Sequence, residues 1–327
     1  MKQRRISQLW LRSIVRIKLF KEYNVDIQAL IDNIIALKKE RGAVILAHNY
    51  QIAEIQALAD ITGDSLALAR AAVSVPEETI VFCGVRFMAE SAAILNPSKK
   101  VLLPAKNAGC PLADMATPAA VERMREKHPD AAVVCYVNSS AEVKAVSDVC
   151  CTSGNAVKVV QNIKQDTIIF VPDKNLGAYV QKMVPEKNVI LWDGFCLVHH
   201  NVTESEVLKA RKEHPTAAIM AHPECPEHVL AHVDHIASTA GMFSYVQESS
   251  AEEFVVLTEK GMLWGLQEQN PTKKFYFPSP ALRCRNMKLT TLQLVYDALE
   301  KDQYVISIDP DIAAKARVSL NKMLEYV

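Results

Sequence analysis

The chain has 327 residues, of which 50% are hydrophobic, and it carries 37 basic and 37 acidic side chains. This length and composition are typical of a globular protein with two or three compact units, each with its own core. The formal net charge of zero gives no basic footprint for nucleic acid, and no apolar run reaches the roughly 18 residues that span a bilayer. We therefore expect neither nucleic acid nor a membrane as a partner.

The first 24 residues differ from the rest of the chain. They contain seven Lys or Arg and no acid before Glu22. They lack the continuous apolar core and the small-residue cleavage site of a secretory signal. A transit peptide and a basic surface helix are alternatives, and we interpret residues 1–24 as a basic N-terminal extension outside the core.

Beyond residue 24, short apolar runs alternate with segments of helical periodicity. The runs are apolar throughout, as in strands that helices cover on both faces of a parallel sheet. Two capping boxes, from Ser139 to Glu142 and from Thr203 to Glu206, predict helix starts. The predicted strands are residues 43–47, 79–83, 101–103, 132–136, 167–171, 189–192, 217–221, 254–257 and 275–277.

The ends of these strands recur at a fixed spacing. His48, Tyr136 and His222 each close the first strand of a unit, at steps of 88 and 86 residues. The same two steps relate four further sets of residues, and such a period indicates internal duplication, although it is too long for a solenoid. These sets are Tyr50, Asn138 and Glu224; Ser65, Ser153 and Thr239; Cys83, Val171 and Leu257; and Pro104, Trp192 and Pro278.

We therefore predict an α/β fold of three homologous small domains, each a doubly wound parallel sheet (Rossmann-like), around a pseudo-threefold axis. The predicted units are residues 25–105, 106–193 and 194–284, with the C-terminal helices of residues 285–327 joining the first unit. Ligands bind outside the carboxyl ends of parallel strands, so three such edges would enclose a central cleft. The cleft would be lined by His48, Tyr50, Ser65, Tyr136, Asn138, Ser153, His222, Glu224 and Thr239.

Each of these residues also has a simpler interpretation. The hydroxyl residues Ser65, Ser153 and Thr239 could be helix caps. A lone histidine is more often a hydrogen-bonded structural residue than a catalyst, and a buried tyrosine often only packs.

Three of the eight cysteines occupy equivalent places in the three units. Cys110, Cys196 and Cys284 each follow the last strand of a unit, on a loop that contains Gly or Pro. Three thiolates held close together need a cation, because like charges repel. Zinc would require a fourth ligand, whereas an iron–sulfur cluster held by three cysteines keeps one iron open as a Lewis acid.

The other five cysteines are interpreted as structural: Cys83, Cys135, Cys150, Cys151 and Cys225. No CxxC pair occurs in the sequence. This usage favours a cytoplasmic chain with reduced thiols.

Several motifs together resemble those of the quinolinate synthase family, from about residue 25 to about residue 300. They are "LAHNYQ", "GDSLALAR", "FCGVRFMAE", "CYVNSS", "CTSGNAVK", "WDGFCLVH", "HPEC", "STAGM" and "CRNMK". The resemblance implies the condensation of iminoaspartate (iminosuccinate) with dihydroxyacetone phosphate to quinolinate, with release of phosphate and two waters. It also implies a functional link to an aspartate-oxidising enzyme.

The resemblance further implies a [4Fe–4S] cluster with Cys110, Cys196 and Cys284 as ligands and one open iron. It implies that the nine cleft residues bind substrate, together with Val137 and Pro223, and we expect Tyr50, Tyr136, His222 and Glu224 to be catalytic. The family's redox-sensitive CxxCxxC is absent around Cys284, and Arg285 departs from the family's usual proline.

Two rival interpretations remain at this stage. A cluster-dependent hydro-lyase acting on a hydroxy acid would share the three-thiolate site with an open iron. A non-catalytic iron–sulfur sensor would share the ligands, but nothing in the sequence resembles an output module such as a basic helix-turn-helix.

Overall fold

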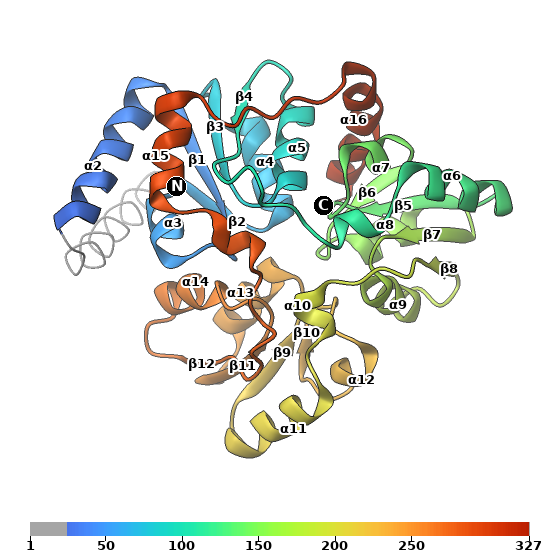
Figure 1. Cartoon of the computed structure of the whole chain (residues 1–327). Helices are drawn as coiled ribbons and strands as arrows, with labels where there is room; N and C mark the ends of the chain where they lie inside the picture. Colours follow the sequence, from blue (N-terminus) through green and yellow to red (C-terminus); the bar gives the residue numbers. More distant parts are fainter. Residues whose placement is uncertain (1–24, 327) are drawn as a thin grey trace.

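The computed structural model describes residues 25–326, so the predicted basic extension lies outside the described residues. It contains three four-stranded sheets in which all strands are parallel. Figure 1 shows the sheets and their helices as three lobes around a common centre. The predicted α/β fold of three Rossmann-like units is confirmed.

The three sheets have the same strand order, with the first strand of each unit between its second and third strands. The first sheet has the order β2-β1-β3-β4, the second β6-β5-β7-β8 and the third β10-β9-β11-β12. The bounds are β1 Ala43–His48, β2 Ile61–Gly63, β3 Thr79–Cys83, β4 Lys100–Leu102, β5 Ala132–Tyr136, β6 Val149–Cys151, β7 Thr167–Val171, β8 Asn188–Leu191, β9 Ala218–Ala221, β10 His235–Ile236, β11 Glu253–Leu257 and β12 Lys274–Tyr276.

Helices cover the sheets and connect consecutive strands, as parallel pairing requires. In the first unit these are α2 Val25–Glu40, α3 Ala53–Leu58, α4 Ser65–Ser74 and α5 Arg86–Leu95. The second unit has the 3-10 helix η1 Ala113–Met115, α6 Pro118–Lys127, α7 Ala141–Ala145, α8 Ala156–Asn162 and α9 Lys174–Met183. The remaining helices are α10 Leu197–His200, α11 Glu204–Glu213, α12 Glu227–Leu230, α13 Thr239–Glu248, α14 Met262–Gln269, the 3-10 helix η2 Asn286–Leu289, α15 Leu292–Lys301 and α16 Pro310–Glu325.

All nine predicted strands occur, with ends within one residue of the prediction. The prediction missed β2, β6 and β10, which are edge strands of two or three residues. The capping box at Thr203 and Glu206 is confirmed. The one predicted from Ser139 is wrong: Ser140 caps α7, while the Ser139 hydroxyl donates to the Tyr136 carbonyl at 2.9 Å.

A further repeated interaction confirms the threefold design. In each unit an aspartate side chain accepts a hydrogen bond from one backbone N–H of the first strand, at 2.7–2.8 Å. The same carboxylate also forms an ion pair with a Lys or Arg of the preceding helix. Equivalent residues of the three sets are 86 to 88 positions apart along the chain. They are Asp60, Ile45 and Lys38; Asp148, Val133 and Arg125; and Asp234, Ile219 and Arg211.

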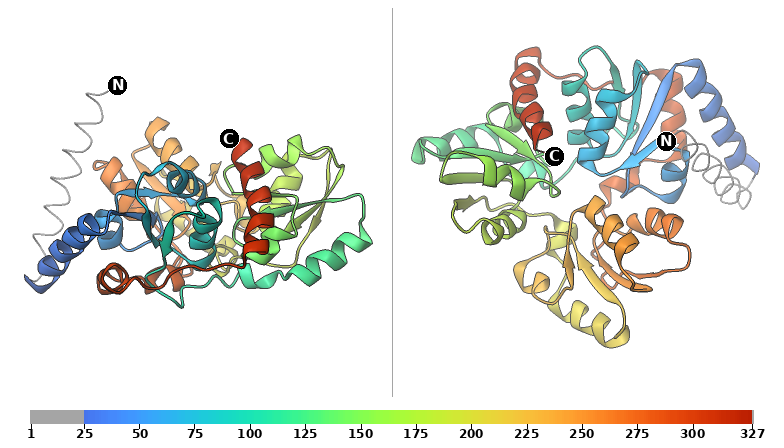
Figure 2. Two further views of the ribbon diagram at one scale, coloured as in Figure 1. Left: turned by 90° about the horizontal axis from the view of Figure 1, so that it is seen from above. Right: turned by 180° about the vertical axis from the view of Figure 1, so that it is seen from behind.

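The two C-terminal helices pack on different units. Helix α15 packs against α2 and β3 of the first unit, whereas α16 packs against α7 and β6 of the second and α5 of the first. Figure 2 shows α16 lying between these two lobes. Arg317 Nε donates to the Ile94 carbonyl at 2.6 Å and Ser319 Oγ to the Lys144 carbonyl at 2.8 Å, so α16 joins both units. The unit boundaries themselves stay predictions.

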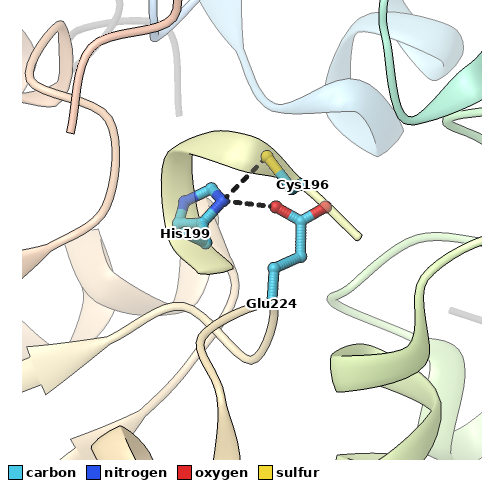
Figure 3. A group of neighbouring side chains, drawn as sticks. All are labelled: Cys196, His199 and Glu224. Carbon is cyan, nitrogen blue, oxygen red and sulfur yellow. Dashed lines mark hydrogen bonds and ion pairs between the residues drawn. The ribbon is translucent and has the colours of Figure 1, made fainter. Parts of the chain in front are cut away.

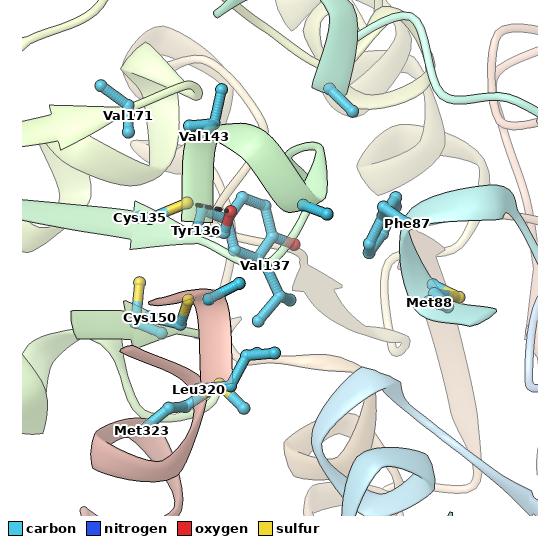
Figure 4. Packing of buried hydrophobic residues seen from close by; sticks show 14 of the residues in the cluster. Phe87, Met88, Cys135, Tyr136, Val137, Val143, Cys150, Val171, Leu320 and Met323 are labelled. Atoms are coloured by element: carbon cyan, nitrogen blue, oxygen red, sulfur yellow. Dashed lines mark hydrogen bonds between the residues drawn. The ribbon is translucent and has the colours of Figure 1, made fainter. Parts of the chain in front are cut away.

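The core of the second unit continues into the first through α16. Figure 4 shows Val137 packed near Leu320 and Met323 of α16, with Phe87 and Met88 of the first unit close by. The strands β1, β5 and β11 are buried along nearly all of their length because helices cover both faces of each sheet. Within residues 25–326, no helix is both long enough and apolar enough to cross a bilayer.

Candidate active site

The carboxyl ends of the three sheets meet at a cavity of about 490 Å³ that residues of all three units line. Every cleft residue predicted from the repeat lines it, and so do the three cysteines in register. These are His48, Tyr50, Ser65, Tyr136, Asn138, Ser153, His222, Glu224 and Thr239, with Cys110, Cys196 and Cys284.

Val137 and Pro223 do not line the cavity. Both are buried, and Val137 is 3% exposed within the hydrophobic core. Side chains alternate along extended backbone, so Val137 faces away from the cavity that its neighbours Tyr136 and Asn138 reach.

The strand ends and helix starts position these side chains. His48 and Tyr136 are the last residues of β1 and β5, and His222 follows β9. Ser65 and Thr239 are the first residues of α4 and α13, whose N-caps are Asp64 and Ser238. The capping interpretation therefore does not apply to these two hydroxyls, which are placed beside the free N–H groups of two helix N-termini.

Glu224 lies at the centre of the site and is only 2% exposed. His199 Nδ1 donates to Glu224 Oε2 at 2.6 Å, and Asn138 Nδ2 lies 3.5 Å from Oε1. Burial raises the pKa of Glu224, but His199, His222 and the hydrogen bonds from His199 and Tyr136 lower it more, to about 2. Glu224 is therefore a buried, ionised carboxylate at neutral pH.

A chain of hydrogen bonds connects Glu224 with Tyr50. His199 Nε2 lies 2.9 Å from Thr258 Oγ1, which lies 2.7 Å from the Tyr50 hydroxyl. The same tyrosine hydroxyl lies 3.1 Å from Thr239 Oγ1. His199 and Thr258 therefore link the carboxylate of the third unit to a phenol of the first.

The two histidines at the strand ends are neutral. Burial, assisted by Lys288 and His222, lowers the pKa of His48 to about 3, and burial also lowers the pKa of His222 to about 3. His48 Nδ1 accepts the Tyr50 N–H at 3.1 Å and His222 Nδ1 accepts the Glu224 N–H at 3.3 Å. Each ring then carries its proton on Nε2, and His222 Nε2 lies 3.0 Å from Ser153 Oγ.

Glu224 Oε2 also lies 3.4 Å from His222 Nδ1. That contact is an ion pair only if the imidazole is protonated, and burial of the ring opposes protonation. The shorter contact of Glu224 Oε2 is with His199 Nδ1, at 2.6 Å, whereas His222 Nδ1 accepts the Glu224 backbone N–H.

Both tyrosines keep their protons. Burial and the nearby Glu224 carboxylate raise the pKa of Tyr50 and of Tyr136 well above the usual value. Each phenol is therefore a hydrogen-bond donor inside the cavity. Asn138 Oδ1 is buried and has no hydrogen-bond partner within the described part of the chain, so it is available to accept a donor from a bound molecule.

The donor set fits an iron–sulfur cluster with three protein ligands. Cys110, Cys196 and Cys284 line one cavity and are partly exposed, whereas the other five cysteines are buried. Burial raises the pKa of Cys110 to about 12 and raises those of Cys196 and Cys284. The thiols therefore stay protonated unless a cation binds, and soft thiolates with no fourth cysteine in the cavity suit a cluster with one open iron.

A smaller group could also hold a metal ion. Ligand atoms of Cys196, His199 and Glu224 all lie within 4.8 Å of one another. Figure 3 shows these three side chains converging, with dashed lines from one His199 nitrogen to the thiol and to the carboxylate. The His199 Nδ1 atom is 3.3 Å from Cys196 Sγ.

The rim of the cavity is basic. Arg283 and Arg285 flank Cys284, line the cavity and are exposed. The arginine ion pairs among residues 25–326 involve neither of them, because they are formed by Arg41, Arg86, Arg125 and Arg211. The two guanidinium groups are therefore free to bind anions.

Sequence reasoning missed several residues of the site. His199 follows Cys196 by three positions, but the equivalent residues are Ala113 and Met287, so the repeat gave no signal for it. Thr258 is fully buried and directly follows β11. A signal was present for Asp173 and Glu259, which follow Val171 and Leu257 by two residues.

Comparison with known proteins shows the family of the chain. Residues 32–325 match the family model described as quinolinate synthetase A protein. The chain is 54% identical to the quinolinate synthase of Alkaliphilus metalliredigens over 296 residues, which is 90% of this chain and 98% of the relative. It is 51% identical to that of Caldicellulosiruptor saccharolyticus over 92% and 99% of the two chains, and 48% identical to that of Thermodesulfovibrio yellowstonii over 91% and 98%. The chain therefore belongs to the quinolinate synthase family, whose members are enzymes of NAD biosynthesis.

Proposed function

We propose that this enzyme condenses iminoaspartate with dihydroxyacetone phosphate to quinolinate, releasing phosphate and two waters. The observation that carries the proposal is the composition of one cavity, in which three thiols, an ionised carboxylate and two protonated phenols converge. Condensation and aromatisation need a base to remove carbon-bound protons and acids to protonate leaving oxygens. The cavity supplies both kinds of group.

Glu224 is the proposed base. It is ionised at neutral pH and can take a proton from a carbon next to a carbonyl or imine, although a pKa of about 2 makes it a weak base. Glu224 then passes this proton to a leaving hydroxyl of the substrate, because His199 Nδ1 already carries a hydrogen in the 2.6 Å contact. Tyr50 is placed to donate its hydroxyl proton to a second substrate oxygen and regains a proton from solvent when the product leaves, with Thr258 and His199 holding the phenol in place.

Tyr136 and the neutral His48 and His222 orient the substrates in this proposal. His48 Nε2–H and His222 Nε2–H are donors for carbonyl or carboxylate oxygens, and Tyr136 donates from the second unit. Asn138 Oδ1 accepts the imine N–H or a hydroxyl. Such fixed donors in a dry cavity stabilise charge that develops on substrate oxygens.

The anionic groups of both substrates have suitable partners. Ser65 and Thr239 stand beside the N-termini of α4 and α13, which favour carboxylate or phosphate oxygens. Arg283 and Arg285 at the rim would draw in these anions. We assign the phosphate to the side of the cavity that Arg283 and Arg285 line.

Cys110, Cys196 and Cys284 would hold the [4Fe–4S] cluster, which when bound supplies an open iron as a Lewis acid for loss of a hydroxyl. We also propose that the enzyme acts in the cytoplasm and receives iminoaspartate from an aspartate-oxidising enzyme, because an imine hydrolyses readily in water.

The test is anaerobic purification with iron and sulfide analysis, followed by a quinolinate assay with both substrates. We expect about four irons per chain, quinolinate formation, and loss of both in Cys110→Ala, Cys196→Ala and Cys284→Ala. Cys83→Ala is the matched control, because Cys83 is buried in β3 and does not line the cavity. Cluster content that survives Cys284→Ala, or a loaded enzyme that makes no quinolinate, would overturn the proposal.

A further inference from the structure

Each of the three cysteine loops is tied to its own sheet by the same backbone hydrogen bond. The amide N–H of the residue three positions after the end of β3, β7 or β11 donates to a carbonyl in the loop at 2.7–2.9 Å; these residues are Arg86, Lys174 and Lys260. The accepting carbonyls belong to Ala108, Gly194 and Leu282, each two residues before the cysteine. The repeat therefore fixes the loop just before its thiol.

Two of the three loops have a second tie, made by a buried carboxylate. Asp173 Oδ2 accepts the Cys196 N–H at 3.1 Å, and Glu259 Oε1 accepts the Cys284 N–H at 3.0 Å. Both acidic residues are 0% exposed. They occupy equivalent positions of the repeat, and the first unit has Val85 there instead. The three units thus offer an internal comparison of loops with and without the carboxylate.

The two carboxylates differ in how their charge is balanced. Glu259 Oε2 accepts from Lys288 Nζ at 2.9 Å, and Lys288 also donates to the Tyr50 carbonyl. Asp173 has no ion pair within residues 25–326, and its other oxygen caps α9 by accepting the Leu176 N–H at 2.8 Å. Asp173 therefore holds the Cys196 loop through backbone hydrogen bonds alone.

We propose that Asp173 and Glu259 are positioning residues that hold the Cys196 and Cys284 amides and so set the geometry and the potential of the cluster. The inference rests on the proposed function, because it assumes a cluster at the three cysteines. Each carboxylate takes up an N–H that would otherwise be free to donate to a cluster sulfur. Fewer N–H···S bonds lower the reduction potential, which suits a cluster that binds substrate rather than one that carries electrons.

Asp173→Ser separates the loop tie from the helix cap, because a serine at the N-cap still accepts the Leu176 N–H but is too short to reach Cys196. We expect the variant to lose iron to a chelator about 10-fold faster, as for other outer-shell partners of metal ligands. Its cluster should also have a more positive reduction potential. Asp148→Ser is the matched control, since Asp148 is a carboxylate of the same unit that accepts the Val133 N–H at 2.7 Å, away from the cysteine loops.

The double variant Glu259→Gln with Lys288→Met distinguishes position from charge. It removes one negative and one positive group, while the amide oxygen of Gln can still accept the Cys284 N–H. We therefore expect the wild-type rate of iron loss and a nearly unchanged reduction potential, and faster iron loss would mean that the ion pair holds the loop instead of the hydrogen bond to the amide. If Asp173→Ser keeps the wild-type iron-release rate and potential, or if Asp148→Ser loses iron as fast, the proposal is wrong.

Amide hydrogen exchange, read by mass spectrometry, tests the tie without reference to the cluster. In Asp173→Ser we expect faster exchange in the segment around Cys196 and unchanged exchange around Cys110. Equal exchange around Cys196 in the variant and in the wild-type protein would overturn the proposal. If wild type contains no stoichiometric iron, the cluster assignment fails, whereas the exchange result still decides whether the carboxylates hold the loops.

Discussion

His199 Nδ1 lies 2.6 Å from Glu224 Oε2, and the two side chains are 1% and 3% exposed. A buried carboxylate is unfavourable unless a hydrogen-bonded partner compensates its charge. His199 is that partner, and through Thr258 it also connects Glu224 with Tyr50. The proposed base and the proposed acid therefore depend on one histidine that does not stand in register with the repeat.

Replacing His199 with Ala is expected to raise the pKa of Glu224, because His199 is the strongest of the groups that lower it against burial. Hydrogen bonds to charged groups contribute about 1.5–3 kcal/mol, so kcat should fall roughly 10- to 100-fold. The acid limb of the kcat profile should also move to higher pH. Steady-state rates from pH 4 to 9 measure both effects, because the wild-type profile should stay flat down to pH 4 when the pKa of Glu224 is about 2, whereas the acid limb of the variant should enter this range.

The neighbouring His200 provides the control for this variant. It contacts Asn175 at 3.0 Å and does not line the cavity. His200→Gln should keep the wild-type pH profile. An unchanged profile in His199→Ala, with a reduced kcat alone, would mean that His199 only packs against Glu224.

Thr258→Val should interrupt the connection between His199 and Tyr50 with almost no change in side-chain volume. The Tyr50 hydroxyl would keep only its contact with Thr239, so we expect kcat to fall about 10-fold, as for one lost hydrogen bond near the reacting groups. Thr258→Ser retains a hydroxyl and should restore most of the rate. Equal rates in the valine and serine variants would show that the hydroxyl does not participate.

Much of the site could be predicted from sequence because it is built on the repeat. His48, Tyr136 and His222 stand at strand ends, and the strand ends follow from apolar runs of a constant spacing. The partners that set the charge state of the site follow no such pattern. His199 and Thr258 meet Glu224 through the tertiary packing of the third unit. Thr258 reaches Tyr50 only where the third unit faces the first, and no local periodicity encodes either contact.

The same limit explains the C-terminal segment. Helices were predicted there and do form, but a helical pattern does not tell which unit the helix covers. Helix α16 packs on the second unit through Ser319 and on the first through Arg317. These contacts are with backbone carbonyls, which every sequence provides.

His48 and His222 should not titrate between pH 5 and 8. Their pKa values are about 3 in the fold, against about 6.5 when unfolded. From pH 6.5 down to 3 the unfolded chain binds protons that the folded chain does not, so the free energy of unfolding falls as the pH falls. At pH 5 each histidine should contribute about 2 kcal/mol to this loss.

Histidine hydrogen–deuterium exchange, read by mass spectrometry, measures these pKa values residue by residue. The peptides that contain His48 and His222 should show no inflection near pH 6.5, while the same peptides in the denatured protein should show one. A midpoint between pH 6 and 7 in the folded protein would mean that one or both rings are protonated donors and would remove the neutral-imidazole assignment.

Arg283 and Arg285 should govern the capture of anionic substrates rather than the chemical steps. Both are exposed at the cavity rim and have no carboxylate partner within residues 25–326. In the double variant to Gln, kcat/KM at low salt should fall about 10-fold, because basic rims raise association rates by attraction. The dependence of kcat/KM on ionic strength should become shallower, with kcat less affected. The control is Arg123→Gln, at an exposed position of α6, which should change neither kcat/KM nor its dependence on ionic strength. If the salt dependence of kcat/KM stays steep in the double variant, residues other than Arg283 and Arg285 attract the anionic substrates.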